Sequence, residues 1–99
     1  MPGVARLGDI CTEHDCFPPR ANIGASGNVF ANGIGVHRQG DAWDFHTCTD
    51  PMTPHGTHGS VLSGGSPTVF ANGKPVGRIG DAVACGSNVA TGSGNVFAG

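Results

Sequence analysis

The chain has 99 residues, of which 18 are glycine and 7 are proline, and its formal net charge at neutral pH is −2. This length allows one small domain, and the many glycines and prolines favour strands and turns over helices. The charge gives no basic surface for nucleic acid, and no apolar run approaches the ~20 residues that span a bilayer. The composition predicts an all-β domain whose small core needs a metal, disulfides or a partner for stability.

The first residues, MPGVARLGD, lack the apolar segment of a secretory signal. We therefore expect the chain to be made and folded in the cytoplasm, where cysteines stay reduced. In that compartment the four cysteines, some of which lie near histidines, are expected to bind metal rather than to form disulfides.

One motif repeats along the whole chain. Residues 24–41 align without gaps on residues 64–81, while residues 92–99 repeat the first half of the motif and residues 4–9 repeat the second half. This split copy is completed only if the last strand lies beside the first. We predict a closed ring of three β-hairpin units around a pseudo-threefold axis, with the termini paired. The approximate ranges of unit 1, unit 2 and the split unit are 23–48, 62–90, and 91–99 with 1–16.

Each complete unit has the signals of a β-hairpin. Val-Phe-Ala precedes Asn32-Gly33 in unit 1 and Asn72-Gly73 in unit 2, and a second short run follows. Asn-Gly between short apolar runs favours a type I′ turn. The Gly-Asp that ends the unit predicts a glycine with positive φ. The arginine before it is expected to pair with the aspartate of its own unit or of a neighbouring unit, or to face a partner.

Three hairpins around one axis place equivalent side chains on rings. We expect one ring to fill the core, and the other to face outward or toward a partner that covers it. The two rings consist of the repeated phenylalanines and the valines before them: Phe30, Phe70, Phe97, Val29, Val69 and Val96.

A histidine or cysteine follows each Gly-Asp at a similar offset. His14 and His46 lie five residues after the aspartate of their motif, and Cys85 lies four residues after it. If the units surround one axis, these side chains meet and form a tripod of nitrogen and sulfur donors, which suits zinc.

The fourth donor is expected from the insertion at residues 49–64, which breaks the symmetry of the repeats. It carries His55 and His58, and we favour His58 because it lies nearer the next strand, which can hold it. Four protein ligands leave no open position, so the predicted site is structural. In so small a domain, the free energy of metal binding supplies much of the free energy of folding.

Other side chains compete for these roles. Cys16 and Cys48 share a His-x-Cys pattern, so either could be a donor, or the two could form a disulfide. Cys11 is interpreted as a small buried apolar residue, and His37 as a structural or surface residue. The repeated serines are interpreted as turn formers.

The sequence gives little support for catalysis. It contains neither a Gly-x-Ser-x-Gly elbow nor a phosphate loop, and the segment from His55 to His58 lacks the helix and glutamate of a zinc protease. The enzyme alternative is a zinc-dependent hydrolase with an open coordination position and Glu13 or Asp15 as its base. We predict a protein that is not an enzyme.

The repeats, above all GSPTVFANGKPVGRIGD and Gly-Asp followed by a histidine, resemble those of the PAAR-repeat proteins over essentially the whole chain. The stretches that correspond to Pro-Ala-Ala-Arg are residues 3–6, 35–38 and 75–78. None is a literal match, although each keeps the arginine. The resemblance implies a small β-structured cone with one structural zinc near its apex, bound by three histidines and one cysteine. The ligands are expected to be His14, His46, His58 and Cys85.

The resemblance also implies a function. Such a cone caps and sharpens a trimeric β-helical spike, either the VgrG-like spike of a type VI secretion system or the central spike of a phage baseplate. The cone base binds the spike as one monomer on a trimer, and the apex meets the target-cell membrane only transiently. The protein is then located in the virion tail tip or is secreted at the tip of the injection machine. The alternative is an adaptor that attaches effector proteins to the spike for delivery.

Overall fold

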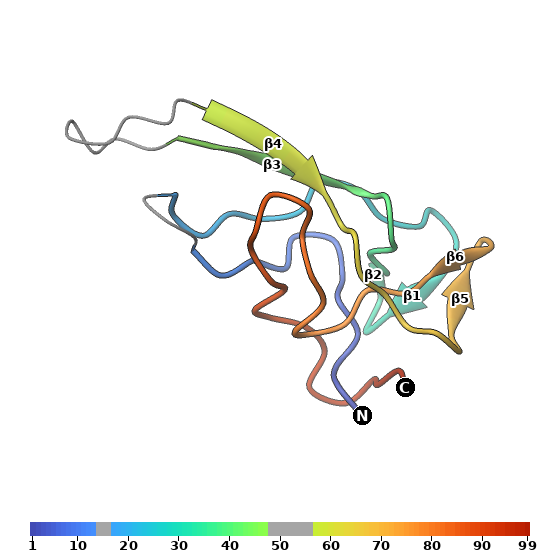
Figure 1. Ribbon diagram of the computed structural model, residues 1–99. Coiled ribbons are helices and arrows are strands. Elements are labelled where there is room, and N and C mark those ends of the chain that lie inside the picture. Colours follow the sequence, from blue (N-terminus) through green and yellow to red (C-terminus); the bar gives the residue numbers. More distant parts are fainter. Residues whose placement is uncertain (14–16, 48–56) are drawn as a thin grey trace.

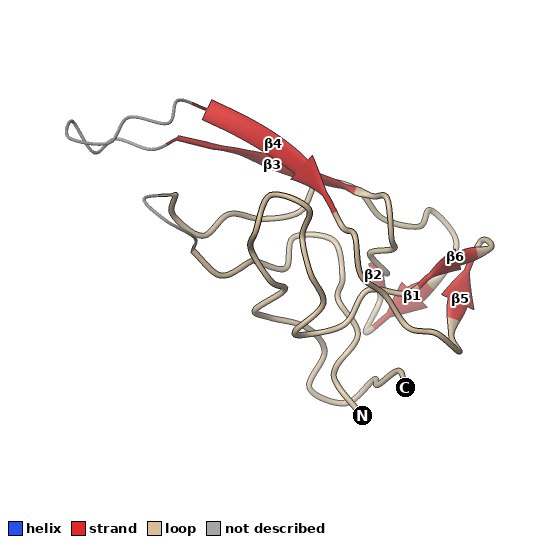
Figure 2. Cartoon of the chain, viewed as in Figure 1, coloured by secondary structure: helices blue, strands red, loops and turns tan. Residues whose placement is uncertain are grey.

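The computed structural model describes residues 1–13, 17–47 and 57–99, and this part of the chain contains no helix. No helix there is therefore long and apolar enough to cross a membrane. The molecule is elongated, with extents of 42 × 23 × 22 Å. Figure 2 shows that short strands are joined by extensive loops. The predicted all-β class is confirmed.

In the described residues, six strands form three antiparallel pairs (Figure 1). Two of these pairs are the predicted repeat hairpins, and the third carries the insertion between the repeats. The pairs are β1 (Phe30–Ala31) with β2 (Ile34–Gly35), β3 (Ala42–Thr47) with β4 (Thr57–Val61), and β5 (Phe70–Ala71) with β6 (Lys74–Pro75).

The Asn-Gly pairs make the turns of the repeat hairpins. Asn32 and Gly33 have φ values of 57° and 75°, and Asn72 and Gly73 have φ values of 55° and 77°. Positive φ at both central residues is what a type I′ turn requires, and asparagine tolerates it better than other residues with a side chain. The predicted turns are confirmed.

Three Val-x-Arg segments close a ring around the pseudo-threefold axis. Each valine bridges the arginine of a neighbouring segment: Val4 with Arg78, Val36 with Arg6, and Val76 with Arg38. The middle residues complete the ring, because Ala5 donates its backbone N–H to Gly77, Gly77 to His37, and His37 to Ala5, at 2.8, 2.8 and 2.9 Å. The predicted closed ring of three units is therefore present.

The two termini lie side by side, as predicted (Figure 1). Gly3 bridges Phe97, and the N–H of Val4 donates to the carbonyl of Val96 at 2.9 Å. The end of the chain thus supplies the half-unit that its beginning lacks.

The core differs from the prediction. Phe30, Phe70 and Phe97 are 58, 56 and 49% exposed, and the valines before them are 36 to 39% exposed. The expectation that one of these rings fills the core is wrong. Three strands that meet closely on one axis leave room only for small side chains, and alternation along each strand then turns the phenylalanine outward. The buried cluster consists of Val4, Ala31, Val36, Ala71, Val76 and Ala98.

A second buried cluster joins the ring to the β3–β4 hairpin. It is assembled by three equivalent bridges, Asn22 to Trp43, Leu62 to Val83, and Cys11 to Val89. Cys11 is 1% exposed, which confirms its interpretation as a buried residue. The members of the cluster are Ala5, Cys11, Trp43, Leu62, Val83 and Val89.

Each motif arginine pairs with the aspartate of its own unit, which decides among the predicted alternatives. The closest contacts of the three ion pairs measure 3.1, 2.8 and 2.8 Å. Each carboxylate also accepts the backbone N–H of the same arginine, at 2.7 to 2.9 Å. The glycine before each aspartate has a φ of 88 to 94°, as predicted. The ion pair therefore closes the turn that ends each unit.

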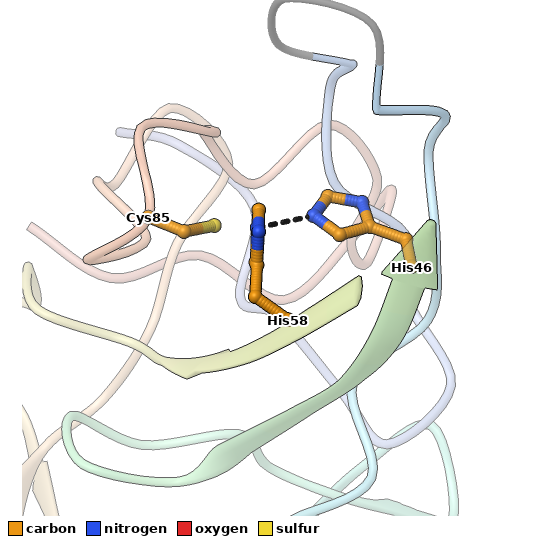
Figure 3. Close-up of side chains that lie close together, drawn as sticks. All are labelled: His46, His58 and Cys85. Atoms are coloured by element: carbon orange, nitrogen blue, oxygen red, sulfur yellow. Dashed lines mark hydrogen bonds between the residues drawn. The ribbon is translucent and has the colours of Figure 1, made fainter. Parts of the chain in front are cut away.

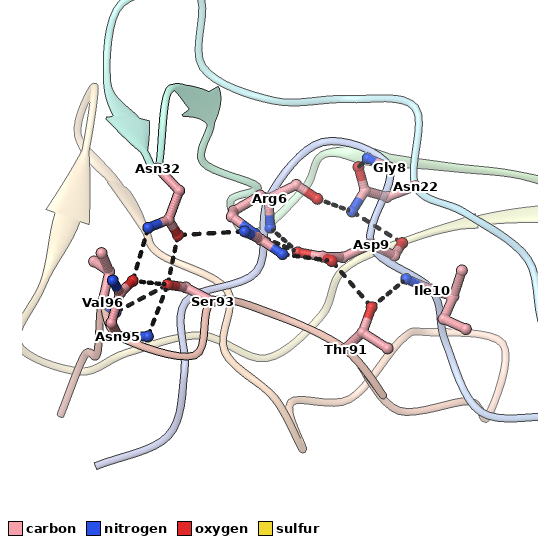
Figure 4. A network of polar contacts seen from close by, with 10 residues as sticks. All are labelled: Arg6, Gly8, Asp9, Ile10, Asn22, Asn32, Thr91, Ser93, Asn95 and Val96. Atoms are coloured by element: carbon pink, nitrogen blue, oxygen red, sulfur yellow. Dashed lines mark hydrogen bonds and ion pairs between the residues drawn. The ribbon is translucent and has the colours of Figure 1, made fainter.

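A polar network ties the split unit to unit 1 (Figure 4). Asn32 accepts hydrogen bonds from Arg6 at 3.2 Å and from the hydroxyl of Ser93 at 2.6 Å. The same hydroxyl accepts the backbone N–H groups of Asn95 and Val96, which confirms the repeated serine as a turn former. Units 1 and 2 are joined in the same way through Ser26, Arg38 and Asn72.

Candidate metal centre

Two histidines and one cysteine converge beside the β3–β4 hairpin (Figure 3). His46 on β3 pairs in register with His58 on β4, and Cys85 comes from a loop that is distant in sequence. The potential ligand atoms of the three side chains all lie within 4.8 Å of one another. The Nε2 atoms of His46 and His58 are 2.7 Å apart. The hairpin and the loop therefore bring together three side chains that can bind one ion.

The surroundings of His46 direct its Nε2 atom toward the cluster. Its Nδ1 lies 2.8 Å from the carbonyl oxygen of Pro18, and since a carbonyl only accepts, Nδ1 carries the proton. Nε2 is then left with the lone pair that a metal needs. The ring of Phe17 packs on both histidines, with centroid distances of 4.8 Å to His46 and 4.2 Å to His58.

The sulfur of Cys85 lies among hydrogen-bond donors. Burial opposes ionisation of the thiol, but the backbone N–H of Ser87 and the side chains of Arg20, His58 and Ser60 outweigh it and lower the pKa of Cys85 to about 6. The group is therefore largely a thiolate at neutral pH. The thiolate is the form of cysteine that binds metal.

This donor set fits zinc. Two imidazole nitrogens and a thiolate are the mixed ligands that zinc accepts in structural sites. Bonds of ~2.0–2.1 Å at a tetrahedral angle separate two nitrogen ligands by about 3.3 Å. The rings of His46 and His58 therefore have to move apart by roughly half an ångström to exchange their hydrogen bond for two metal bonds.

The structure brings three of the four predicted ligands together, namely His46, His58 and Cys85. His37 lies away from this cluster, at the central ring. It is fully buried, and its Nδ1 lies 2.6 Å from the carbonyl oxygen of Gly24, so it is a structural residue and not a surface one. The predicted ligand and the competing residues that lie outside the described part of the chain are His14, His55, Cys16 and Cys48.

Sequence reasoning missed Phe17 and Arg20, which both contact the cluster. They lie just before the repeat block that begins at residue 24, so the alignment of the repeats does not include them. The 40-residue offset of that block, extended a few residues upstream, places Arg20 opposite Ser60. Both side chains donate to the sulfur of Cys85, and the offset is the signal that could have found them.

Residues 18–91 match the PAAR motif, a range that contains His46, His58 and Cys85. The chain is also 35% identical, over 82 residues, to two proteins of Pseudomonas aeruginosa: the NAD(P)(+) glycohydrolase toxin Tse6 and the (p)ppApp synthetase toxin Tas1. The aligned part covers 78% of this chain but only 18% of each toxin. The similarity therefore concerns a small portion of each toxin.

Proposed function

The chain belongs to the PAAR motif family, a structural family, and from that premise we propose that it caps the trimeric spike of a contractile injection machine. The end with the exposed phenylalanines binds the spike, and the metal-stapled end faces the envelope to be pierced. The role is mechanical and needs no catalysis. The protein leaves the cytoplasm with the machine, on a virion tail tip or on a secreted spike.

The observation that carries this proposal is the apolar ring that the free chain leaves exposed. Each unit contributes a phenylalanine that is about half exposed and a valine that is more than a third exposed. β1, β2, β5, β6 and both termini lie away from the end of the β3–β4 pair at which Thr47 pairs with Thr57 (Figure 1). A ring repeated around a pseudo-threefold axis suits a threefold partner, because each partner chain meets one unit in the same way.

At the other end we propose one structural zinc, held by His14, His46, His58 and Cys85. The described cluster supports this proposal with three donors from two strands and one loop. An ion there ties the β3–β4 pair to the loop that carries Cys85. Zinc binding of ~10–16 kcal/mol in small zinc domains is comparable to the whole stability of a typical domain. Such a staple keeps the leading end folded under load.

An adaptor for effector proteins is the second candidate function. It is favoured by the finding that a region similar to this chain forms part of two toxins, Tse6 and Tas1. A chain of this kind could carry a separate toxin non-covalently. Capture of an effector by the spike-bound chain, lost in variants that still cap the spike, distinguishes the adaptor from a plain tip.

The capping proposal is tested with the purified spike trimer from the same gene cluster. Native mass spectrometry should find one chain per trimer. Replacing Phe30 and Phe70 by serine should weaken this complex at least ~100-fold, because buried aromatic anchors each contribute about 2 kcal/mol or more. Phe45→Ser is the matched control, since Phe45 is 66% exposed but lies on β3, outside the ring.

Two results would contradict the capping proposal. One is a folded wild-type chain that does not bind the folded spike. The other is a double variant that binds as tightly as the wild type, since the exposed ring would then have no part in the complex.

A further inference from the structure

We propose that Arg20 is a positioning residue of the metal centre: its guanidinium holds the sulfur of Cys85 so that it binds a single ion. The inference rests on the metal centre proposed above. It concerns a residue that lies outside the aligned repeats and belongs to none of the ion pairs that close them.

Arg20 is 8% exposed, and every nitrogen of its guanidinium has a partner. Nη2 donates to the sulfur of Cys85 at 3.2 Å, Nη1 to the sulfur of Cys11 at 2.8 Å, and Nε to the carbonyl of Asp44 at 2.8 Å. The group also lies over the ring of Trp43, 5.4 Å from its centroid. These contacts come from three different segments, so the planar fork of arginine is locked in one orientation.

The charge of Arg20 points to the same role. In residues 1–13, 17–47 and 57–99 the ion pairs with carboxylates involve the three motif arginines, and Arg20 is not among them. A buried cation without a counter-ion is costly. A cysteine that binds a metal does so as a thiolate, so a metal-bound Cys85, 3.2 Å from Nη2 of Arg20, can serve as that counter-ion. Arg20 and a metal-bound Cys85 therefore stabilise each other.

The pseudo-threefold symmetry shows that Arg20 is one of three equivalent donors. Arg20, Ser60 and Ser87 each lie six residues before the repeated serine of their unit. All three donate to the sulfur of Cys85, the two serines through a hydroxyl and a backbone N–H. The sulfur also contacts the side chain of His58 and lies 3.9 Å from the hydroxyl of Ser87, and a bound ion would replace the contact with His58. Because the three donors already surround the sulfur, we expect it to bind one ion terminally and not to bridge two.

The test is the affinity and the spectrum of the Co²⁺-loaded protein, with Arg20→Met and Arg20→Lys as variants. Removing a group that supports a metal ligand typically weakens metal binding 10–100-fold. We expect that loss in Arg20→Met, a smaller loss in Arg20→Lys, and a shift of the sulfur-to-cobalt charge-transfer band in both. Lys74→Met is the control, because it removes a cation of β6, on a repeat hairpin, and should leave cobalt affinity and spectrum unchanged.

The outcomes separate this inference from the proposed metal centre. A folded wild-type chain that binds no Co²⁺ overturns both. A wild type that binds tightly, with variants of equal affinity and unshifted band, overturns the role of Arg20 alone. If Arg20→Met does not fold, Arg20→Lys decides: wild-type affinity and spectrum overturn the inference, whereas weaker binding with a shifted band supports it.

Discussion

The two ends of the molecule use the same threefold framework in different ways. In the ring of Val-x-Arg segments and the exposed phenylalanines, the three units carry the same residue at equivalent positions. Near the candidate metal centre, equivalent positions carry different residues, such as Arg20, Ser60 and Ser87. Repetition therefore builds a surface that suits a symmetric partner, and departures from repetition build the cluster for which we propose one ion. The cluster further depends on His58, from an insertion that occurs once.

At the centre of the ring, the backbone is repeated but the side chains differ among the three units. At the centre of the ring the equivalent residues are His37, Ala5 and Gly77, which carry a large side chain, a methyl group and no side chain. Since all three lie close to one axis, a single large side chain excludes others. The framework thus remains symmetric in its backbone while its interior becomes asymmetric.

Removing the metal from its end of the molecule should have the largest effect on stability. We expect a chelator to lower the thermal unfolding temperature by about 15 °C or more, since each kcal/mol is worth ~4–8 °C in a domain of this size and the ion supplies several. Calorimetry with and without chelator measures the shift. His46→Ala is the control, because it should unfold at the lower temperature in both conditions. A wild-type unfolding temperature that is the same with and without chelator would contradict a metal staple.

Adding a side chain at Gly77, beside the axis of the ring, should have the next largest effect on stability. A Cβ atom on Gly77 would lie 2.6 Å from the Cδ2 atom of Leu62 and 3.1 Å from the carbonyl oxygen of His37. We expect Gly77→Ala to lower the free energy of unfolding by ~1–3 kcal/mol, as overpacking does in other cores. Gly27→Ala is the matched control, because a Cβ there meets nothing within 4 Å. Equal stability of the two variants in urea denaturation would show that the axis has spare room.

Acidification should have the smallest effect, through His37. Burial is the main cause that lowers the pKa of His37 from its ordinary value, and it outweighs the opposing hydrogen bond to Gly24 and the nearby charge of Asp41. The unfolded chain takes up a proton at about pH 6.5 and the folded chain only at lower pH, so stability falls as pH drops below that value. The slope is at most ~1.4 kcal/mol per pH unit.

The pH effect is isolated by comparing the wild type with His37→Gln under the same metal conditions. Urea denaturation between pH 7 and pH 5 should give a steeper loss of stability for the wild type. Parallel curves would show that His37 does not titrate differently in the folded and unfolded states.

The sequence predicted the hairpins, their turns, the pairing of the termini and the convergence of His46 and Cys85, because all of these follow from repeat offsets. It predicted His58 from the one insertion that breaks those offsets. It did not predict which side chains fill the core. An alignment establishes that positions are equivalent but not how close they lie to the axis, and that distance selects Ala31 over Phe30. Nor did it find Arg20, whose partners come from segments that only the folded chain brings together.

In our proposal, one end of this symmetric framework is closed by a single metal ion. The most direct test is the zinc content of the chain, purified without added metal and measured by elemental mass spectrometry beside Cys85→Ala. We expect about one zinc per wild-type chain and much less in the variant. A folded wild-type chain without zinc, or a variant that retains it fully, would contradict the metal staple, although the repeat architecture would remain.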